Sequence, residues 1–516
     1  HRDLHSFPTR RSSDLIEQIR KGDFLLVKPG SKIPVDGVII KGFSSIDEQA
    51  ITGESIPVEK NERDTVIGGT INQSGVLTIE VLKTLEDSTL MQIIKLVEAA
   101  ATSKAPIQKL ADQISLVFVP IVIVISIVTF GVWMFLGQSF AYALAMGITV
   151  LVISCPCALG LATPVAIMVG TGKGAEFGVL IKSAESLEIA HKIQTVLLDK
   201  TGTITKGKPI VSDVVAMNGF TPDEIIQLAA SLERNSDHPI AKAIIQKQVE
   251  RHVELIEVTA FENLSGFGLQ GEINGQRILL GNAKLLQKQK HDLVSIQTQL
   301  DDFARQGKTP ILLANSSTVI GIMTIRDELK ETSKQAIERL KKDHLRVIML
   351  TGDNPLTAKA IANEVGIDEV ISDVLPDQKE AIVIQIQNEN QKVAMVGDGI
   401  NDAVALMRSD VGIAIGAGTD VAIESADIVL MKDDLHDVAT AIELSRKTIA
   451  NIKMNLFWAF FYNVSLIPVA AGLFVGLNLT LNPMLASLAM SISSVSVVLN
   501  ALRLRFFKPQ RKENQS

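Results

Sequence analysis

Two long stretches of the chain carry no acidic, basic or histidine side chain, and polar stretches separate and flank them. Residues 113–172 and 454–502 contain no Asp, Glu, Lys, Arg or His. A bilayer core about 30 Å thick needs about 20 apolar residues per helix, so each stretch can hold two spans. A buried helix pair in a soluble protein is the alternative, but charge-free runs of this length disfavour it. We expect transmembrane helices near residues 114–136, 142–168, 454–475 and 481–502.

Positive charges flank both apolar stretches, whereas the short turns inside them, 137–141 and 476–480, carry none. By the positive-inside rule both helix pairs start and finish in the cytoplasm. The polar segments 16–112 and 173–453 are then cytoplasmic as well. The flanking residues are Lys104, Lys109, Lys173, Lys182, Arg446, Lys447, Lys453, Arg503, Arg505 and Lys508.

Composition fits a membrane protein with large soluble parts. The 516 residues should divide into three or four units. Hydrophobic residues make up 47% and charged residues 21%, so the two kinds must be segregated along the chain. A net charge of −7 and an aromatic content of 4% argue against nucleic-acid binding.

Three apolar runs are each followed by an aspartate near glycine: TVLLDKTGTIT at 195–205, VIMLTGD at 347–353 and VAMVGDGIND at 393–402. If these runs are parallel strands, Asp199, Asp353 and Asp398 converge at one carboxyl edge, where open α/β sheets bind ligands. One carboxylate can attack a phosphorus while others hold Mg²⁺. A single aspartate after a strand can also be a helix cap, so only the set is informative.

Two polar segments have patterns of their own. Residues 21–80 are rich in Val, Ile, Thr and Gly, which predicts a small β-domain, with ITGES at 51–55 in a loop. Between residues 207 and 322 the strand-end pattern is interrupted, which predicts an inserted domain. It contains SLERNSDHPIA at 231–241, GFGLQG at 266–271 and GN at 281–282. We expect the glycines to allow close backbone approach to a ligand.

The two cysteines, Cys155 and Cys157, both lie in SCPCALG, in the middle of an expected span. A disulfide between residues two apart is implausible, and ordinary core packing is the simpler alternative. Pro156 removes a backbone donor and should disrupt the helix, which would let carbonyls and sulfurs face an ion path. Thiolates select Cu(I), Ag(I) or the borderline Zn(II) and Cd(II).

Together, DKTGT, TGD, GDGIND, ITGES and CPC resemble the heavy-metal class of P-type ATPases over about residues 16–505. The resemblance implies a multi-domain membrane protein: an α-helical transmembrane bundle, a β-rich actuator domain, an α/β haloacid-dehalogenase-like phosphorylation domain and an inserted α+β nucleotide-binding domain. It also implies a P-type ATPase that requires ATP and Mg²⁺.

The resemblance assigns roles to individual residues. Asp199 becomes the aspartyl phosphate, and Glu54 activates the water that hydrolyses it. Thr201, Thr351 and Lys379 surround the phosphoryl group, and Asn401 supports the site. Mg²⁺ is assigned to Asp199, Thr201, Asp398 and Asp402, and the nucleotide to Glu233, His238, Gly266, Gly268, Asn282, Gly352 and Asp353.

The transported ion is assigned to Cys155 and Cys157 together with Tyr462, Asn463, Met490 and Ser494, which match the copper class. A thioether suits Cu(I), and the spans lack the carboxylate or Lys expected of a divalent-metal pump. We therefore expect Cu(I) export, with Ag(I) as a second cargo. A Zn(II)/Cd(II) pump is the alternative, and a membrane-tethered aspartyl-phosphate phosphohydrolase is a more distant one.

The expected organisation leaves the start of the chain outside the pattern. Residues 1–15 read as a disordered or non-native lead, and the resemblance implies a carboxy-terminal fragment that lacks the family's first helices. It allows a cytosolic copper chaperone as a partner and predicts a multi-pass protein of the cell membrane. The expected segments are actuator 16–95, helices 96–172, phosphorylation domain 173–213 and 322–453, nucleotide-binding domain 214–321, helices 454–505 and a polar tail 506–516.

Overall fold

The computed structural model divides the chain into two compact units. One comprises the chain up to Lys192 with Asp427–Lys432 and Thr440 onward, and the other comprises Ile193–Ala426 and Asp433–Ala439. The structure describes residues 16–49, 57–103, 105–154, 157–234, 236, 239–264, 267–399, 402–416 and 420–509.

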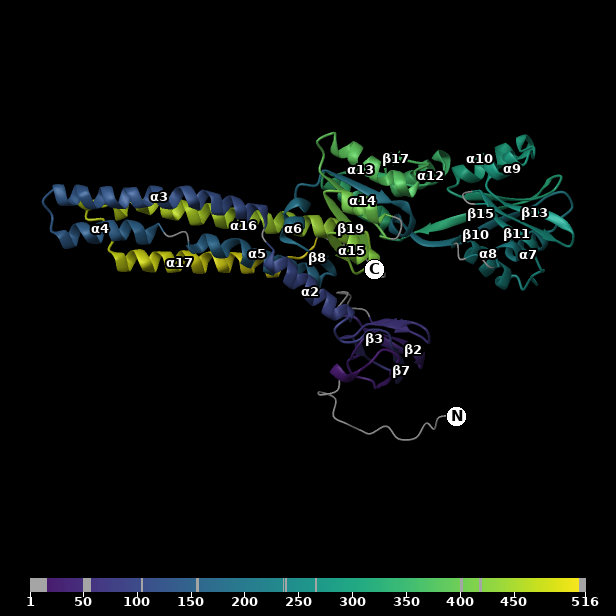
Figure 1. Cartoon of the computed structure of the whole chain (residues 1–516), viewed down its shortest axis with the longest axis horizontal. Helices are drawn as coiled ribbons and strands as arrows, with labels where there is room; N and C mark the ends of the chain where they lie inside the picture. Colours follow the sequence, from purple (N-terminus) through teal and green to yellow (C-terminus); the bar gives the residue numbers. More distant parts are fainter. Residues whose placement is uncertain are drawn as a thin grey trace. The chain divides into compact units, whose positions relative to one another are not determined.

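The first unit begins with two small antiparallel sheets (Figure 1). Alternate residues of their strands point inward, as Leu77 and Ile79 do in β7, and build one apolar core. One sheet has the order β1-β7-β2-β5 and the other β4-β3-β6. The bounds are η1 Ile16–Gln18, β1 Phe24–Val27, β2 Gly37–Lys41, β3 Ser44–Asp47, β4 Val58–Lys60, β5 Thr65–Val66, β6 Ile71–Asn72 and β7 Leu77–Val81.

Long apolar helices of the same unit lie side by side (Figure 1). Three are long and apolar enough to cross a membrane: α3, α16 and α17 with its terminal turn. Helix α4 is apolar but shorter. The bounds are α2 Thr89–Thr102, α3 Pro106–Phe135, α4 Phe140–Ile153, α5 Cys157–Glu176, β8 Val179–Ile181, α6 Ala184–Ala190, β20 Ile428–Leu430, α16 His436–Ala470, η5 Val475–Leu477, α17 Pro483–Leu502 and η6 Arg503–Phe506.

Two expected spans differ from the observed helices. The single helix expected over 142–168 is two helices, since α4 ends at Ile153 and α5 begins at Cys157. Helix α4 ends with Ser154 as its C-cap, and residues 155 and 156 lie outside the described residues, so the disruption expected at Pro156 stays a prediction. Helix α16 begins 18 residues before the expected start of its span at 454, because the helix continues beyond the apolar stretch into polar sequence.

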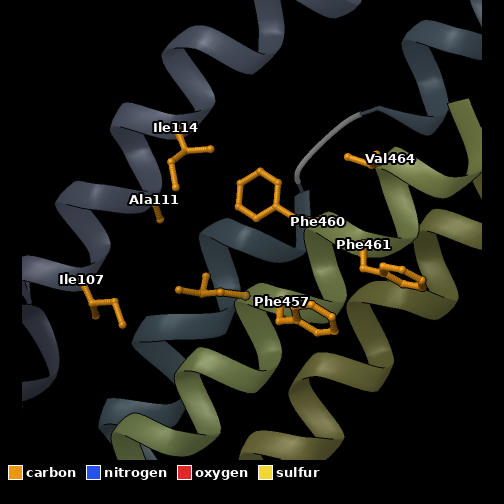
Figure 2. Close-up of a pocket in the computed structure, with 8 residues that line it drawn as sticks. Ile107, Ala111, Ile114, Phe457, Phe460, Phe461 and Val464 are labelled. Atoms are coloured by element: carbon orange, nitrogen blue, oxygen red, sulfur yellow. The ribbon is translucent and has the colours of Figure 1, made fainter.

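An apolar groove of about 420 Å³ lies between α3 and α16 (Figure 2). All of its lining residues are apolar: Ile107, Ala111, Ile114, Leu456, Phe457, Phe460, Phe461 and Val464. Its side chains offer no donor atom to a cation.

The second unit contains the expected parallel sheet. Strand β9 lies between β16 and β18, in the order β17-β16-β9-β18-β19 with all four pairings parallel. Every residue of β9, β18 and β19 is buried, as in a sheet covered on both faces. The bounds are β9 Thr195–Asp199, η2 Lys200–Ile204, α11 Ser333–Lys342, β16 Arg346–Leu350, α12 Pro355–Val365, β17 Glu369–Ile371, η4 Pro376–Gln378, α13 Lys379–Gln387, β18 Val393–Gly397, α14 Ala403–Arg408, β19 Val411–Ile415 and α15 Asp420–Ser425.

The insertion forms a six-stranded antiparallel sheet of order β10-β15-β14-β13-β12-β11 with two separate apolar cores. The segment limits expected at 213/214 and 321/322 fall inside the long paired strands β10 and β15. The bounds are β10 Thr205–Ala216, α7 Pro222–Glu233, α8 Pro239–Glu250, β11 Thr259–Leu264, β12 Gly268–Ile273, β13 Gln276–Gly281, α9 Ala283–Lys288, η3 Val294–Ile296, α10 Gln297–Arg305, β14 Thr309–Asn315 and β15 Val319–Leu329.

Candidate functional site

Asp199 is the last residue of β9, at the carboxyl edge of the parallel sheet. Its side chain is buried, and its Oδ1 accepts a hydrogen bond of 2.6 Å from Nζ of Lys379, the first residue of α13. The same ammonium donates to Oδ1 of Asp402 at 2.5 Å. One buried cation therefore joins two buried carboxylates that come from different strand ends.

The electrostatics of this cluster favour an added cation. Burial, reinforced by Asp402, raises the pKa of Asp199 to about 7, although Lys379 opposes the shift. Burial also raises the pKa of Asp402. Burial alone would lower the pKa of Lys379, but the two carboxylates outweigh it and raise that pKa. The carboxylates, with Asp398 close enough to act on Asp199, outnumber the local cation.

The turn η2 carries the DKTGT sequence past this cluster. Gly202 has φ 72°, which favours glycine, and a Cβ there would lie 3.4 Å from Oδ2 of Asp398. The turn therefore brings its backbone beside the third strand-end aspartate. Thr201 is exposed at the open side of the turn, whereas Thr203 is buried.

The TGD sequence forms a second anchor beside Asp199. Oγ1 of Thr351 donates to Oδ2 of Asp353 at 3.1 Å and accepts from the Asp353 N–H at the same distance. Asp353 also accepts from Nζ of Lys200 at 2.7 Å. In this structure Asp353 thus holds the lysine that follows the central aspartate, and Gly352 lies between the two anchored residues.

The donor set fits Mg²⁺. Oδ2 of Asp402 is buried and makes no hydrogen bond within the described part of the chain. Mg²⁺ takes oxygen ligands, and here carboxylates of Asp199, Asp398 and Asp402 gather beside the Thr201 turn. These are the residues that the sequence assigns to the metal.

A pocket of about 370 Å³ in the insertion brings together three of the expected nucleotide residues, Glu233, Gly268 and Asn282. Glu233 ends α7 and is buried, which raises the pKa of its carboxyl group against a hydrogen bond from Ser236. Its Oε2 has no hydrogen-bond partner among the described residues. Such an oxygen is suited to accept from a bound ligand.

Gly268 is required by strand packing rather than by the expected close approach of the backbone to a ligand. A Cβ on Gly268, whose φ is 144°, would lie 2.2 Å from the carbonyl oxygen of Leu280. The glycine is thus required by close packing of β12 on β13, while its backbone still lines the pocket. Asn282 caps α9 by accepting from the Leu285 N–H at 3.0 Å.

Sequence reasoning missed the apolar walls of this pocket. Phe267, inside the GFG sequence, could have been noticed there as an aromatic, whereas Pro310 and Ile311 begin a later strand without a local signal. The remaining lining residues are Ser236, Ile240, Asn263, Leu264, Leu269, Leu280, Gly281 and Thr309.

The expected ion ligands of the later helices have unequal environments. Asn463 and Met490 are buried, and Met490 packs with Val150 and Ile153 in the last turn of α4, just before the CPC sequence. Oγ of Ser494 donates to the Met490 carbonyl at 3.2 Å. Tyr462 is 45% exposed, because neighbouring residues on a helix point about 100° apart.

Some expected site residues lie outside the described residues. They are Glu54, Cys155, His238, Gly266 and Asn401, together with the side chain of Cys157.

Family comparisons agree with this architecture. Residues 193–410 match the haloacid dehalogenase-like hydrolases, and residues 12–98 match the P-type ATPase actuator domain. A solved zinc-transporting PIB-type ATPase in the E2.Pi state is 35% identical, covers 95% of this chain and 79% of its own, and has a TM-score of 0.64. The chain therefore belongs to the P-type ATPases, in the heavy-metal PIB class.

The more similar curated relatives carry copper in their names. The probable copper-transporting ATPase PacS of Synechococcus elongatus is 50% identical over 497 residues, 96% of this chain and 66% of that protein. The copper-exporting P-type ATPase of Staphylococcus saprophyticus is 49% identical over 496 residues, 96% of this chain and 61% of that protein. This chain thus spans somewhat less than two thirds of these relatives.

Proposed function

We propose that this chain provides the catalytic and ion-binding parts of a pump that exports Cu(I) from the cytoplasm, with ATP phosphorylating Asp199. The observation that carries the proposal is the buried carboxylate of Asp199 at the end of β9, held by Lys379 and flanked by Asp398 and Asp402. The copper names of relatives near 50% identity support the choice of cargo.

The phosphorylation step follows from the geometry of the strand ends. An Asp199 oxygen attacks the γ-phosphorus of ATP, a new P–O bond forms, and the bond to the bridging oxygen of ADP breaks. Lys379 offsets the negative charge that gathers on the transferred group, and its contact with Asp402 keeps it in place. Mg²⁺, held by Asp199, Thr201, Asp398 and Asp402, would supply further charge stabilisation when bound.

The raised pKa of Asp199 makes its attack on phosphorus less favourable. The raised pKa favours the protonated carboxyl group of Asp199, and the protonated form is a poor nucleophile. A cation bound beside it favours the ionised form. We infer that the excess of carboxylates makes nucleophilic attack depend on metal loading.

The ATP base is proposed to lie in the pocket of the insertion. Oε2 of Glu233 can accept from the exocyclic amino group of adenine, while Phe267 and Ile311 supply apolar walls. Asn282 and Gly268 line the same pocket, and His238 and Gly266 are proposed to complete it. Thr351, Gly352 and Asp353 are proposed to lie near the phosphates.

The transport site is proposed to consist of Cys155, Cys157, Asn463 and Met490. The thiolates and the neutral thioether are soft donors, which suit a monovalent soft ion, Cu(I) or Ag(I). The packing of Met490 against the end of α4 brings one thioether near the turn that precedes both cysteines. Tyr462 and Ser494 are assigned only an outer role in this proposal, because Tyr462 is 45% exposed and Ser494 is only half-buried.

The remaining steps are proposed from the family resemblance. Glu54 takes a proton from the water that attacks phosphorus, so that the bond between phosphorus and Asp199 breaks and the carboxylate is regenerated. Residence in the cell membrane and delivery of copper by a cytosolic chaperone are part of the same proposal.

Metal-dependent phosphorylation of the intact protein tests the proposal. With γ-labelled ATP and Mg²⁺, we expect an acid-stable phosphoenzyme that requires Cu(I) or Ag(I). Asp199→Asn should abolish the label, and Cys155→Ser with Cys157→Ser should abolish the label that Cu(I) or Ag(I) induces. Stimulation by Zn(II) without stimulation by Cu(I) would replace the copper assignment by the Zn(II)/Cd(II) alternative. A phosphoenzyme indifferent to metals in the wild type and in the cysteine variants would favour a phosphohydrolase.

A further inference from the structure

The turn η6 at the end of α17 has two sharply different sides. Leu504 and Phe507 are buried, and the ring of Phe507 packs edge-on against Phe177, the residue that follows α5, with 6.0 Å between centroids. Arg503, Arg505, Phe506 and Lys508 are exposed. The inward pair holds the turn on the helix bundle, so its charged side chains are presented outward.

The charge on this outward side is not compensated locally. From residue 444 to residue 508 the sequence contains six Lys or Arg and no Asp or Glu. Among the described residues no ion pair involves Arg503, Arg505 or Lys508, and Arg503 donates only a 3.3 Å hydrogen bond to Oδ1 of Asn500. Lys173 nearby on α5 differs, because Glu176 neutralises it at 2.5 Å.

An exposed aromatic ring continues the exposed apolar stripe of α17 into this turn. The outward apolar residues of the helix repeat at helical spacing and are each more than half exposed. Phe506 extends this series and is 83% exposed. The series consists of Leu488, Ile492, Val495, Leu499 and Phe506. A phenyl ring at the end of a membrane span is suited to the boundary between acyl chains and headgroups.

We propose that residues 503–508 bind the headgroup of an anionic phospholipid in the cytoplasmic leaflet. Arg503 and Arg505 donate to phosphate oxygens in the fork geometry of guanidinium, Lys508 adds charge, and Phe506 inserts beside the acyl chains. Three features commit the site to a lipid: its charge, its continuity with a membrane helix and its exposed ring. A soluble anion would use the charge but not Phe506.

The proposal is tested with the full chain in bilayers, independently of ATP turnover and of the cargo. Phe506→Trp introduces a reporter, and the signal of Trp133 and Trp458 is subtracted with the parent chain. We expect brominated phosphatidylglycerol to quench the reporter with a binding constant at least tenfold above that of brominated phosphatidylcholine. A factor of about five for each of two arginines multiplies to roughly 25-fold, so tenfold is the lower limit.

Charge variants decide between the possible outcomes. Arg503→Gln with Arg505→Gln should remove most of this preference. Arg503→Lys with Arg505→Lys should keep part of it. The control is Lys28→Gln with Lys32→Gln, which removes the same amount of exposed charge from the first sheet region and should leave the preference intact. An unchanged preference in the double Gln variant would overturn the proposal. If about 10 mM inorganic phosphate removed the preference for phosphatidylglycerol in the parent chain, the site would be assigned to a free anion instead.

Discussion

At the scale of single residues, Lys379 decides whether two buried carboxylates can stay ionised. Its ammonium contacts Asp199 and Asp402, and all three side chains are buried. A buried pair that loses its cation leaves an uncompensated charge, which costs about 3–5 kcal/mol. We expect Lys379→Met to lower the unfolding free energy by that amount and to abolish phosphoenzyme formation.

The control for this prediction is an exposed lysine of the same unit. Lys392 pairs with Asp410 at 2.6 Å but is half exposed, so Lys392→Met should cost less than about 1 kcal/mol. Denaturant unfolding measures both. Adding Asp402→Asn to Lys379→Met should recover part of the stability but none of the phosphorylation. Equal losses in the two single variants would show that the buried cluster is not under this electrostatic constraint.

The raised pKa of Glu233 gives the nucleotide pocket a pH signature. The folded chain keeps a proton on Glu233 at pH values where the unfolded chain has lost it. The contribution of Glu233 to stability is therefore present below its ordinary pKa of 4.5 and is lost as the pH rises through the raised pKa of the folded state. Glu233→Gln removes this loss. Without nucleotide, its unfolding midpoint should therefore rise relative to wild type between acidic and neutral pH.

The measurement is the midpoint difference between the two proteins at several pH values. Glu224, exposed at the start of α7, provides the control, because Thr221 lowers its pKa by backbone and side-chain hydrogen bonds. Glu224→Gln should show the opposite trend and lose stability relative to wild type as the pH rises. A constant difference for Glu233→Gln across the pH range would contradict the assignment.

At the scale of elements, the close contact of β12 and β13 depends on Gly268. Its φ of 144° is unfavourable for alanine, and a Cβ at this position would lie only 2.2 Å from the carbonyl oxygen of Leu280. Gly268→Ala should cost about 2–4 kcal/mol from strain and overpacking and should weaken ATP binding by distorting the pocket. Gly275→Ala, in the open turn between the same strands with φ 75° and no atom within 4 Å, should cost about 1–2 kcal/mol and leave ATP binding unchanged.

Denaturant unfolding and ATP titration of both variants check this prediction. If the two glycine variants lose the same stability and the same affinity, the contact between β12 and β13 has no special role.

The sequence predicted the strands of the central sheet but not the surroundings of single side chains. Apolar runs that end in Asp199, Asp353 and Asp398 identified three neighbouring parallel strands, because burial on both faces leaves a continuous local pattern. The exposed position of Tyr462 was not predictable, since helical facing depends on which neighbours pack on α16. The packing reason for Gly268 was hidden for the same reason, because its partner Leu280 is 12 residues away.

At the scale of the whole molecule, the insertion is built as a self-contained body. Both of its apolar cores lie within residues 211–325, and all residues that line the proposed ATP pocket lie within 233–311. Its first and last strands, β10 and β15, pair with each other along most of their length, and Thr205 bonds to Asp327 at their base. The chain therefore leaves and re-enters the parallel sheet at neighbouring positions.

This arrangement predicts that a fragment of residues 205–329 folds alone and binds ATP within about twofold of the affinity of the full chain, a difference of less than about 0.5 kcal/mol. Calorimetric titration without Mg²⁺ measures both affinities. Glu233→Ala should reduce binding by the same factor in the fragment and in the full chain, because the pocket needs no residue from outside the insertion. The contradicting result is a fragment that is folded by circular dichroism but binds ATP more than tenfold more weakly than the full chain. Residues of the phosphorylation sheet would then contribute to ATP binding, and the separation of base binding from phosphoryl transfer would be wrong.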